Sequence, residues 1–168
     1  QEQYLRYDTD FVAGETPEAP ALQVRIDDLV PAPHHLAVRA YAGDRLAARH
    51  DHLDAFDTLA VRVRALEPST RQVEVALVQA DGTSWGAAVP VTAAWQTVAV
   101  PLSALRPVRT VLLPRAYPFF LPYFFTPSHE AAFRLDQLEA VQLSVDGTGA
   151  DVERAAAHGF EVEQVVLK

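Results

Sequence analysis

Residues 71–79, Arg71-Gln-Val-Glu-Val-Ala-Leu-Val-Gln79, alternate apolar and polar side chains and stand just before the turn pair Asp81-Gly82. Alternation with a period of two is typical of a strand that buries one face. The expected buried face consists of Val73, Val75 and Leu77. An Asp-Gly pair between two such runs indicates a tight β-hairpin, with residues 85–91 as the returning strand. The middle of the chain is therefore predicted to be a hairpin with one face in a core.

The same strand signal recurs along most of the chain. We expect further strands at residues 4–11, 21–29, 35–42, 58–64, 95–102, 138–145 and 160–167. No long stretch has the 3.6-residue period of a helix, and only single helical turns are expected, at residues 102–105 and 151–157. Short strands separated by turns predict an all-β fold, an antiparallel β-sandwich or jelly roll. Without a repeat or linker, residues 1–168 are predicted to form one domain.

Composition excludes several classes of protein. The chain has 168 residues and a formal net charge of −8, which argues against nucleic-acid binding because phosphates require a basic face. It has no cysteine, so disulfides and Cys-ligated zinc are excluded. No apolar run reaches the roughly 18–20 residues of a membrane helix, and no membrane insertion is expected. Because the chain starts at Gln1 and contains no Met, we expect a fragment of a larger multidomain protein.

The block Trp95-Gln-Thr-Val-Ala-Val-Pro-Leu-Ser-Ala-Leu105 is followed by a long loop and the two strands at 138–145 and 160–167. Over roughly residues 58–168 this order resembles galactose-binding-like jelly rolls, a similarity at the level of the fold. Non-catalytic carbohydrate-binding modules attached to glycoside hydrolases or polysaccharide lyases belong to this group. The resemblance implies a carbohydrate ligand, an attached catalytic domain, no catalysis of its own, and a secreted protein, extracellular or periplasmic.

Residues 113–127 form the most unusual segment, with six of the fifteen aromatic residues and four prolines. Proline opposes regular strand pairing, so we expect a long, stiff loop. Aromatic rings stack on the flat C–H faces of sugars, polar neighbours bind the hydroxyls, and rigidity lowers the entropic cost of binding. The predicted carbohydrate-binding residues are Trp85, Arg115, Tyr117, Phe119 and Tyr123.

Two alternatives stay open for this segment. It could fold over one open end of the sandwich, or it could dock on a neighbouring domain. In the second case the chain would be a non-binding accessory domain that packs on a catalytic domain or mediates oligomerisation. Trp85, which follows the Asp81-Gly82 turn, is equally compatible with an exposed and a buried position.

Two short motifs raise the alternative of an enzyme. Gly82-Thr-Ser-Trp-Gly86 matches the G-x-S-x-G pattern of hydrolases, but a nucleophile elbow at Ser84 needs a helix after the turn, and a strand is predicted there. His50-Asp-His52 has a spacing that can ligate a metal on a strand. No further metal motif accompanies it, so two solvated histidines are favoured over a metal-dependent jelly-roll enzyme that uses His50 and His52.

Acidic residues lie in the first and last predicted strands. In galactose-binding-like modules the termini often pair and a structural Ca²⁺ often lies near them, and oxygen ligands suit this ion. The resemblance therefore implies a possible calcium site formed by Asp8, Asp10 and Glu163. The alternative is a set of outward-facing acids without a metal. No other cofactor is expected.

Overall fold

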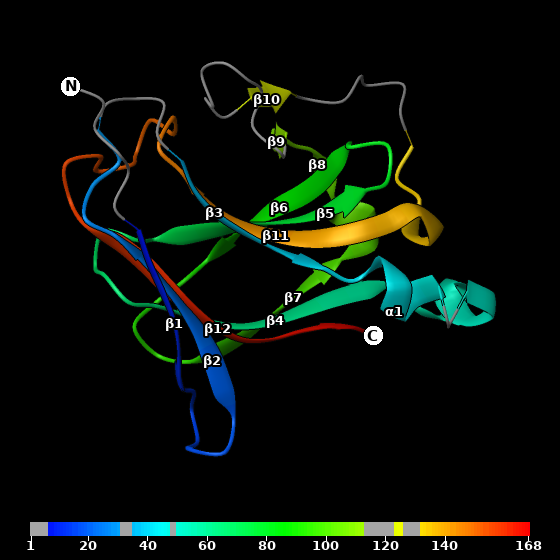
Figure 1. The fold of residues 1–168 in the computed structure, drawn as a ribbon, viewed down its shortest axis with the longest axis horizontal. Helices are drawn as coiled ribbons and strands as arrows, with labels where there is room; N and C mark the ends of the chain where they lie inside the picture. Colours follow the sequence, from blue (N-terminus) through cyan, green and yellow to red (C-terminus); the bar gives the residue numbers. More distant parts are fainter. Residues whose placement is uncertain (1–6, 31–34, 48–49, 113–122, 126–131) are drawn as a thin grey trace.

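The computed structural model describes residues 7–30, 35–47, 50–112, 123–125 and 132–168, in which two five-stranded antiparallel sheets form a sandwich (Figure 1). The first sheet has the order β1 (Tyr7–Ala13), β2 (Pro20–Ile26), β12 (His158–Leu167), β4 (Thr58–Ala65) and β7 (Gln96–Pro101). The second has the order β3 (His35–Tyr41), β11 (Leu138–Asp146), β5 (Gln72–Gln79), β6 (Ser84–Pro90) and β8 (Arg106–Pro107). The predicted antiparallel β-sandwich is confirmed.

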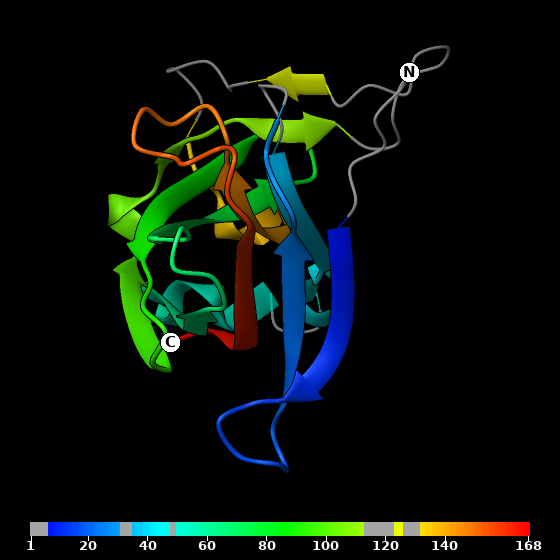
Figure 2. The same cartoon turned by 90° about the vertical axis from the view of Figure 1, so that its left-hand side faces the viewer.

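The remaining elements are short. Strands β9 (Thr110–Leu112) and β10 (Tyr123–Phe125) pair with each other. Figures 1 and 2 show this pair on the side of the second sheet that faces away from the first. The helical turns are α1 (Gly43–Ala47), η1 (His50–Ala55), η2 (Leu102–Ala104) and η3 (Leu135–Gln137). Within the described ranges, no helix has the length and apolar character to cross a membrane.

The C-terminal strand β12 lies in the middle of the first sheet. Its Val162 pairs with Leu22 of β2 on one side and with Val63 of β4 on the other. Phe160 of the same strand is completely buried. Strand β12 therefore joins the N-terminal third of the chain to the rest of the fold. The resemblance to galactose-binding-like jelly rolls had covered only residues 58–168.

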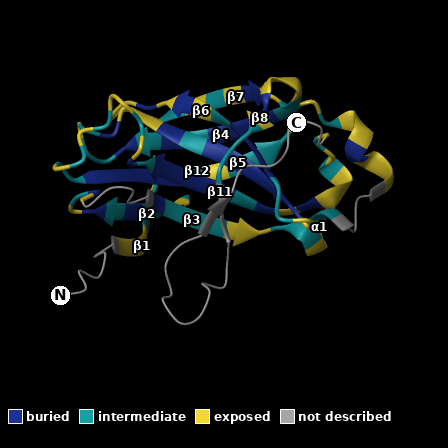
Figure 3. Cartoon of the chain, turned by 90° about the horizontal axis from the view of Figure 1, so that it is seen from above, coloured by how far each residue is buried: buried dark blue, intermediate teal, exposed yellow. Residues whose placement is uncertain are grey.

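The core lies between the two sheets. Val73, Val75 and Leu77 of β5 are buried, as the alternation predicted, and Val61 and Val63 of β4 are buried as well. Figure 3 shows buried residues, in dark blue, along β12 and β4. Burying one such side chain contributes about 1.5–3 kcal/mol, so the alternating strands supply most of the driving force for folding.

The predicted hairpin between β5 and β6 is confirmed. Gly82 has φ of 85°, a conformation that glycine adopts without a steric penalty. The amide and the hydroxyl of Thr83 donate hydrogen bonds of 2.9 and 2.7 Å to the Asp81 carboxylate. These donors, the backbone amide first, lower the pKa of Asp81. The turn is thus stabilised by an ionised side chain.

Two local predictions were wrong. Residues 50–55 form the 3₁₀ turn η1 instead of a strand, because Leu53 alone among its described side chains is buried and one turn suffices to bury it. Residues 151–157 form turns without a helix. There the Arg154 side chain donates to the carbonyls of Gly147 and Gly149, which fixes an irregular loop.

Candidate functional site

The outer face of the second sheet, the side turned away from the first sheet, carries small and polar side chains. Strand pairing places Ser144 of β11 opposite Glu74 of β5, and Glu74 opposite Ala88 of β6. In the neighbouring row, Gln142 is opposite Ala76. Successive residues of a strand point to opposite faces, so these side chains point outward while their neighbours enter the core.

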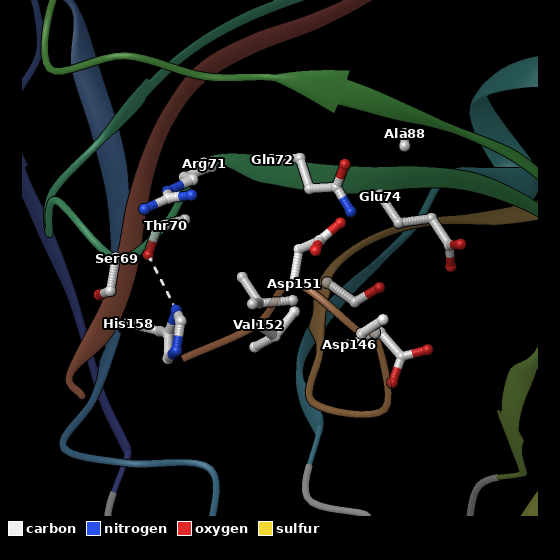
Figure 4. A pocket seen from close by; sticks show the side chains of 14 residues that line it. Ser69, Thr70, Arg71, Gln72, Glu74, Ala88, Asp146, Asp151, Val152 and His158 are labelled. Carbon is white, nitrogen blue, oxygen red and sulfur yellow. Dashed lines mark hydrogen bonds between the residues drawn. The ribbon is translucent and has the colours of Figure 1, made fainter. Parts of the chain in front are cut away.

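A pocket of about 410 Å³ lies at the end of this face, where β11 ends and β12 begins (Figure 4). We call it the β11–β12 pocket. Strands β5, β6 and β11 contribute to it, together with the segment 69–71, the loop 149–152 and His158. Its volume lies within the range of about 300–1,000 Å³ that is typical of small-ligand sites.

The described lining of the pocket is rich in hydrogen-bonding groups and contains no Phe, Tyr or Trp. Its charged and amide side chains are Arg71, Gln72, Glu74, Asp146 and Asp151. Carboxylates only accept hydrogen bonds, a guanidinium only donates them, and an amide does both. This mixture suits a ligand with several hydroxyl or amine groups.

Three buried polar atoms on the outer face have no hydrogen-bond partner among the described residues. They are Oγ of Ser84, Nε2 of Gln142 and Oγ of Ser144. All three residues are at most 1% exposed. Since nearly all buried polar groups in proteins are hydrogen-bonded, such atoms indicate a place where a partner is missing. Ser144 is also one of the residues that line the β11–β12 pocket.

His158 fixes one wall of the pocket. The ring is 1% exposed, and its Nε2 lies 3.0 Å from the Glu153 carbonyl, which can only accept a hydrogen bond. In the neutral ring Nε2 therefore carries the hydrogen, and Nδ1 faces the Thr70 hydroxyl at 3.4 Å. The same hydroxyl accepts a bond of 2.9 Å from the Gly159 amide. Because both ring nitrogens are engaged in this wall, we assign His158 a structural role.

The loop that forms the opposite wall is held by side chains at its start. Thr148 donates to the Asp146 carboxylate through its amide at 2.8 Å and through its hydroxyl at 2.7 Å. Arg154 binds the loop carbonyls from the other side. The pocket is therefore walled by hydrogen-bonded segments, which limits the ordering needed when a ligand enters.

Trp85 occupies the buried one of its two predicted positions. It is 8% exposed and belongs to the core, where its ring centroid lies 6.2 Å from that of Phe133. Its predicted role as an open platform for a sugar ring is not compatible with this burial. Arg115, Tyr117 and Phe119 lie outside the described residues, and of Tyr123 only the backbone, the first residue of β10, is described. For these four residues the carbohydrate-binding role stays a prediction.

The Ser84 motif does not have the surroundings of a nucleophile elbow. Ser84 is completely buried and begins β6, and the chain continues as a strand to Pro90. An elbow would place the serine on an exposed turn before a helix. The predicted strand after this motif is confirmed.

The predicted metal ligands do not converge. Asp8 and Asp10 are exposed, whereas Glu163 accepts a bond of 3.0 Å from the Glu15 amide and lies 3.4 Å from the Arg62 guanidinium. In the part of the chain that the structure describes, no three His, Asp or Glu side chains are grouped so as to hold a metal ion. Calcium binding therefore stays a prediction without a site in those residues.

Sequence reasoning missed the β11–β12 pocket. Its residues come from four separate parts of the chain and share no motif. One signal was available, because polar residues occupy the outward positions of β5 and β11 where a fully covered strand would be apolar. These residues are Gln72, Glu74, Gln142 and Ser144.

No protein-family profile and no curated protein matches the chain. Solved structures do match it over nearly its whole length. The family 11 carbohydrate-binding module of the cellulosomal cellulase Lic26A-Cel5E of Clostridium thermocellum matches with a TM-score of 0.60 and 12% identity, over 99% of this chain and 83% of that chain. A family 11 module from Clostridium thermocellum in complex with a β-1,3-1,4-mixed-linked tetrasaccharide gives a TM-score of 0.61 at 12% identity, over 99% of this chain and 84% of that chain.

An exo-β-agarase structure also matches, with a TM-score of 0.55 and 10% identity. The match covers 98% of this chain but 22% of the agarase chain. At these identities the comparisons concern the fold. The chain has a β-sandwich jelly-roll fold similar to that of family 11 carbohydrate-binding modules.

Proposed function

We propose that the domain binds carbohydrate without catalysis, through the outer face of the second sheet and the β11–β12 pocket. The observation that carries this proposal is the β11–β12 pocket with its polar lining, next to which the buried Ser144 hydroxyl has no partner among the described residues. The fold supports it, because one similar structure is a carbohydrate-binding module in complex with a tetrasaccharide.

The lining of the pocket matches the chemistry of sugar hydroxyls, which both donate and accept hydrogen bonds. Glu74 and Asp151 accept, Arg71 donates, and the Ser144 hydroxyl does both. Each such bond has a net value of about 0.5–1.5 kcal/mol, so several are needed for useful affinity. A ligand hydroxyl that reaches Ser144 also removes the cost of its unsatisfied burial.

In our proposal, the aromatic segment 113–127 contributes rings that stack on the sugar. Strand β10, which starts at Tyr123, lies on the same side of the second sheet as the outward polar residues (Figures 1 and 2). A ring presented there would stack on a sugar whose hydroxyls enter the pocket. We therefore keep Tyr117 and Tyr123 as stacking residues.

We further propose that the domain serves an attached carbohydrate-active enzyme in an extracellular setting. Two comparisons support this. One similar module comes from a cellulosomal cellulase, and in the agarase the matching part covers 22% of a longer chain. The domain would then hold the enzyme near its substrate and raise the effective concentration of that substrate.

The test is a binding screen of this domain against soluble and insoluble polysaccharides, by affinity electrophoresis and pull-down. We expect retention by at least one polysaccharide, with weaker retention of the Ser144→Ala and Tyr123→Ala variants. The control is Asp54→Asn, a change at an exposed residue of η1, an element that contributes no residue to the pocket. No retention across the panel, or equal retention of all variants, would refute the proposal.

A further inference from the structure

The chain segment that follows β8 crosses the outer face of the second sheet. Gly86 of β6 is opposite Ala76 of β5 and shares its outward face, and a Cβ atom placed on Gly86 would lie 3.1 Å from Cγ2 of Val108. Val108 therefore covers this face at β6. The next residue, Arg109, donates a hydrogen bond of 3.3 Å to the hydroxyl of Thr148, in the loop after β11. Residues 108 and 109 thus connect β6 with the end of β11 across the face.

The row of outward residues next to the pocket is closed to solvent. Gln142 of β11 and Ala76 of β5 are opposite each other, and both are almost completely buried. Gly86 of β6, the next residue in this row, is buried as well. A saccharide that lay along the strands would have to cross this row. The β11–β12 pocket therefore ends here and does not continue as a groove along the outer face.

The pocket is also closed at β11 and opens towards β6. In the row that forms its floor, Ser144 of β11 is completely buried, whereas Ala88 of β6 is exposed. Hydrogen bonds of His158 and Arg154 hold the two walls on either side. The volume of about 410 Å³ is near the lower end of the range for small-ligand sites and has room for about one or two sugar units. Such a space admits the end of a chain and leaves no path for the chain to continue beyond it.

Three polar side chains of the pocket are available to a ligand. Arg71, Gln72 and Asp151 are exposed and line the space (Figure 4). Their side chains have no hydrogen-bond or ion-pair partner among the described residues, whereas Glu74 and Asp146 are already engaged within the domain. The three available groups are one cation, one anion and one amide, so no charge is in excess among them. They suit neutral hydroxyl groups, which both donate and accept hydrogen bonds.

We propose that the β11–β12 pocket takes the terminal sugar unit of a saccharide chain, so that the domain recognises chain ends instead of stretches within a chain. This rests on the proposed function and specifies which part of the carbohydrate is bound. A terminal unit has a free hydroxyl where a unit within the chain carries the next sugar. That hydroxyl fits the closed end of the pocket, where a further sugar has no room. Arg71, Gln72 and Asp151 bind the other hydroxyls of the terminal units.

The experiment uses the polysaccharide retained in the binding screen, cut by partial acid hydrolysis into a long-chain and a short-chain fraction. A reducing-sugar assay measures the number of chain ends in each fraction. Saturation isotherms of the domain on equal masses then give the number of binding sites per gram and the Kd. We expect the sites per gram to increase with the number of chain ends, about tenfold for chains cut to about a tenth of their length, at an unchanged Kd.

The outcomes separate this inference from the proposed function. A number of sites per gram that stays constant or falls as the chains become shorter would show that the domain binds within chains. That result would overturn the inference and leave carbohydrate binding intact. No retention by any polysaccharide in the screen would refute the proposed function and this inference together.

Two variants with matched controls locate the binding of chain ends. Asp151→Ala and Gln72→Ala should each raise the Kd for the short-chain fraction by about two- to tenfold, the effect of one lost hydrogen bond, with the sites per gram unchanged. The controls Asp54→Ala in η1 and Gln137→Ala in η3 change exposed residues outside the pocket and should leave the Kd unchanged. An unchanged Kd in both pocket variants, or an equal increase in the controls, would overturn the assignment of the terminal unit to this pocket.

Discussion

The outer faces of the two sheets differ in whether their polar side chains have hydrogen-bond or ion-pair partners. On the first sheet, charged side chains have partners: Arg64 lies 2.6 Å from Glu161, and Arg25 lies 2.8 Å from Glu67. On the second sheet, the buried polar atoms of Ser84 and Ser144 have no partner in the described chain. The charged side chains of the first face are thus paired within the domain, whereas these two hydroxyls of the second face have no partner among the described residues.

The two tryptophans lie beside different sheets, and the buried indole nitrogen of each has no partner among the described residues. Trp95 lies under the Arg64 guanidinium, which is 5.0 Å from its ring centroid. It is half-buried and outside the central core. Trp85 lies in the core beneath the second sheet. Neither tryptophan ring is fully exposed.

The largest expected change is a loss of stability when an ion pair of the first sheet's outer face is broken. In Arg64→Ala, the Glu161 carboxylate, 3% exposed, loses its counterion, and we expect the free energy of unfolding to fall by about 2 kcal/mol. This is less than for a fully buried pair, because the Arg64 side chain is 34% exposed and solvent screens it. Urea denaturation measures the change. The control Arg45→Ala alters an exposed arginine of α1 and should stay within about 0.5 kcal/mol.

The next effect is on binding at the second face. Ser144→Ala should weaken binding of the polysaccharide found in the screen by about tenfold, since a ligand group loses a buried partner. Its free energy of unfolding should change by less than about 0.5 kcal/mol, because the hydroxyl has no described partner to lose. A large loss of stability with unchanged affinity would reverse the roles we assign to the two faces.

A smaller change in stability is expected at the β5–β6 hairpin of the second sheet, where the Asp81 carboxylate has hydrogen-bond donors. Hydrogen bonds from Thr83 lower the pKa of Asp81 in the folded state. The ionised carboxylate therefore stabilises the fold above its unfolded pKa near 4. This contribution is lost as the pH falls through the folded pKa. Asp81→Asn should cost less than about 1 kcal/mol at neutral pH and nothing once Asp81 is protonated. Denaturation between neutral pH and about pH 2 tests this. A constant difference across that range would contradict it.

The smallest effect is expected at Ser84. Ser84→Ala removes a buried hydroxyl without a described partner, so stability should stay within about 0.5 kcal/mol or rise slightly. Thermal denaturation is sufficient to measure it. A loss above about 1 kcal/mol would show that the hydroxyl is satisfied, and would remove one of the three atoms that distinguish the second face.

The sequence by itself determined the strands and their buried faces. Val73, Val75 and Leu77 were predicted to be inward because the two-residue period is a local property that does not depend on the choice of partner strand. The Asp81-Gly82 turn was predictable for the same reason, since only a few adjacent residues define it.

Only the tertiary structure decided how the strands are ordered and where the site lies. Strand β12 is between β2 and β4, and the β11–β12 pocket joins Thr70, Glu74, Ser144 and the loop 149–152. These residues are far apart in the chain, so no local pattern connects them. The burial of Trp85 and the unsatisfied hydroxyl of Ser144 likewise depend on which segments pack against each strand. That is a non-local property, set by the packing of the whole domain.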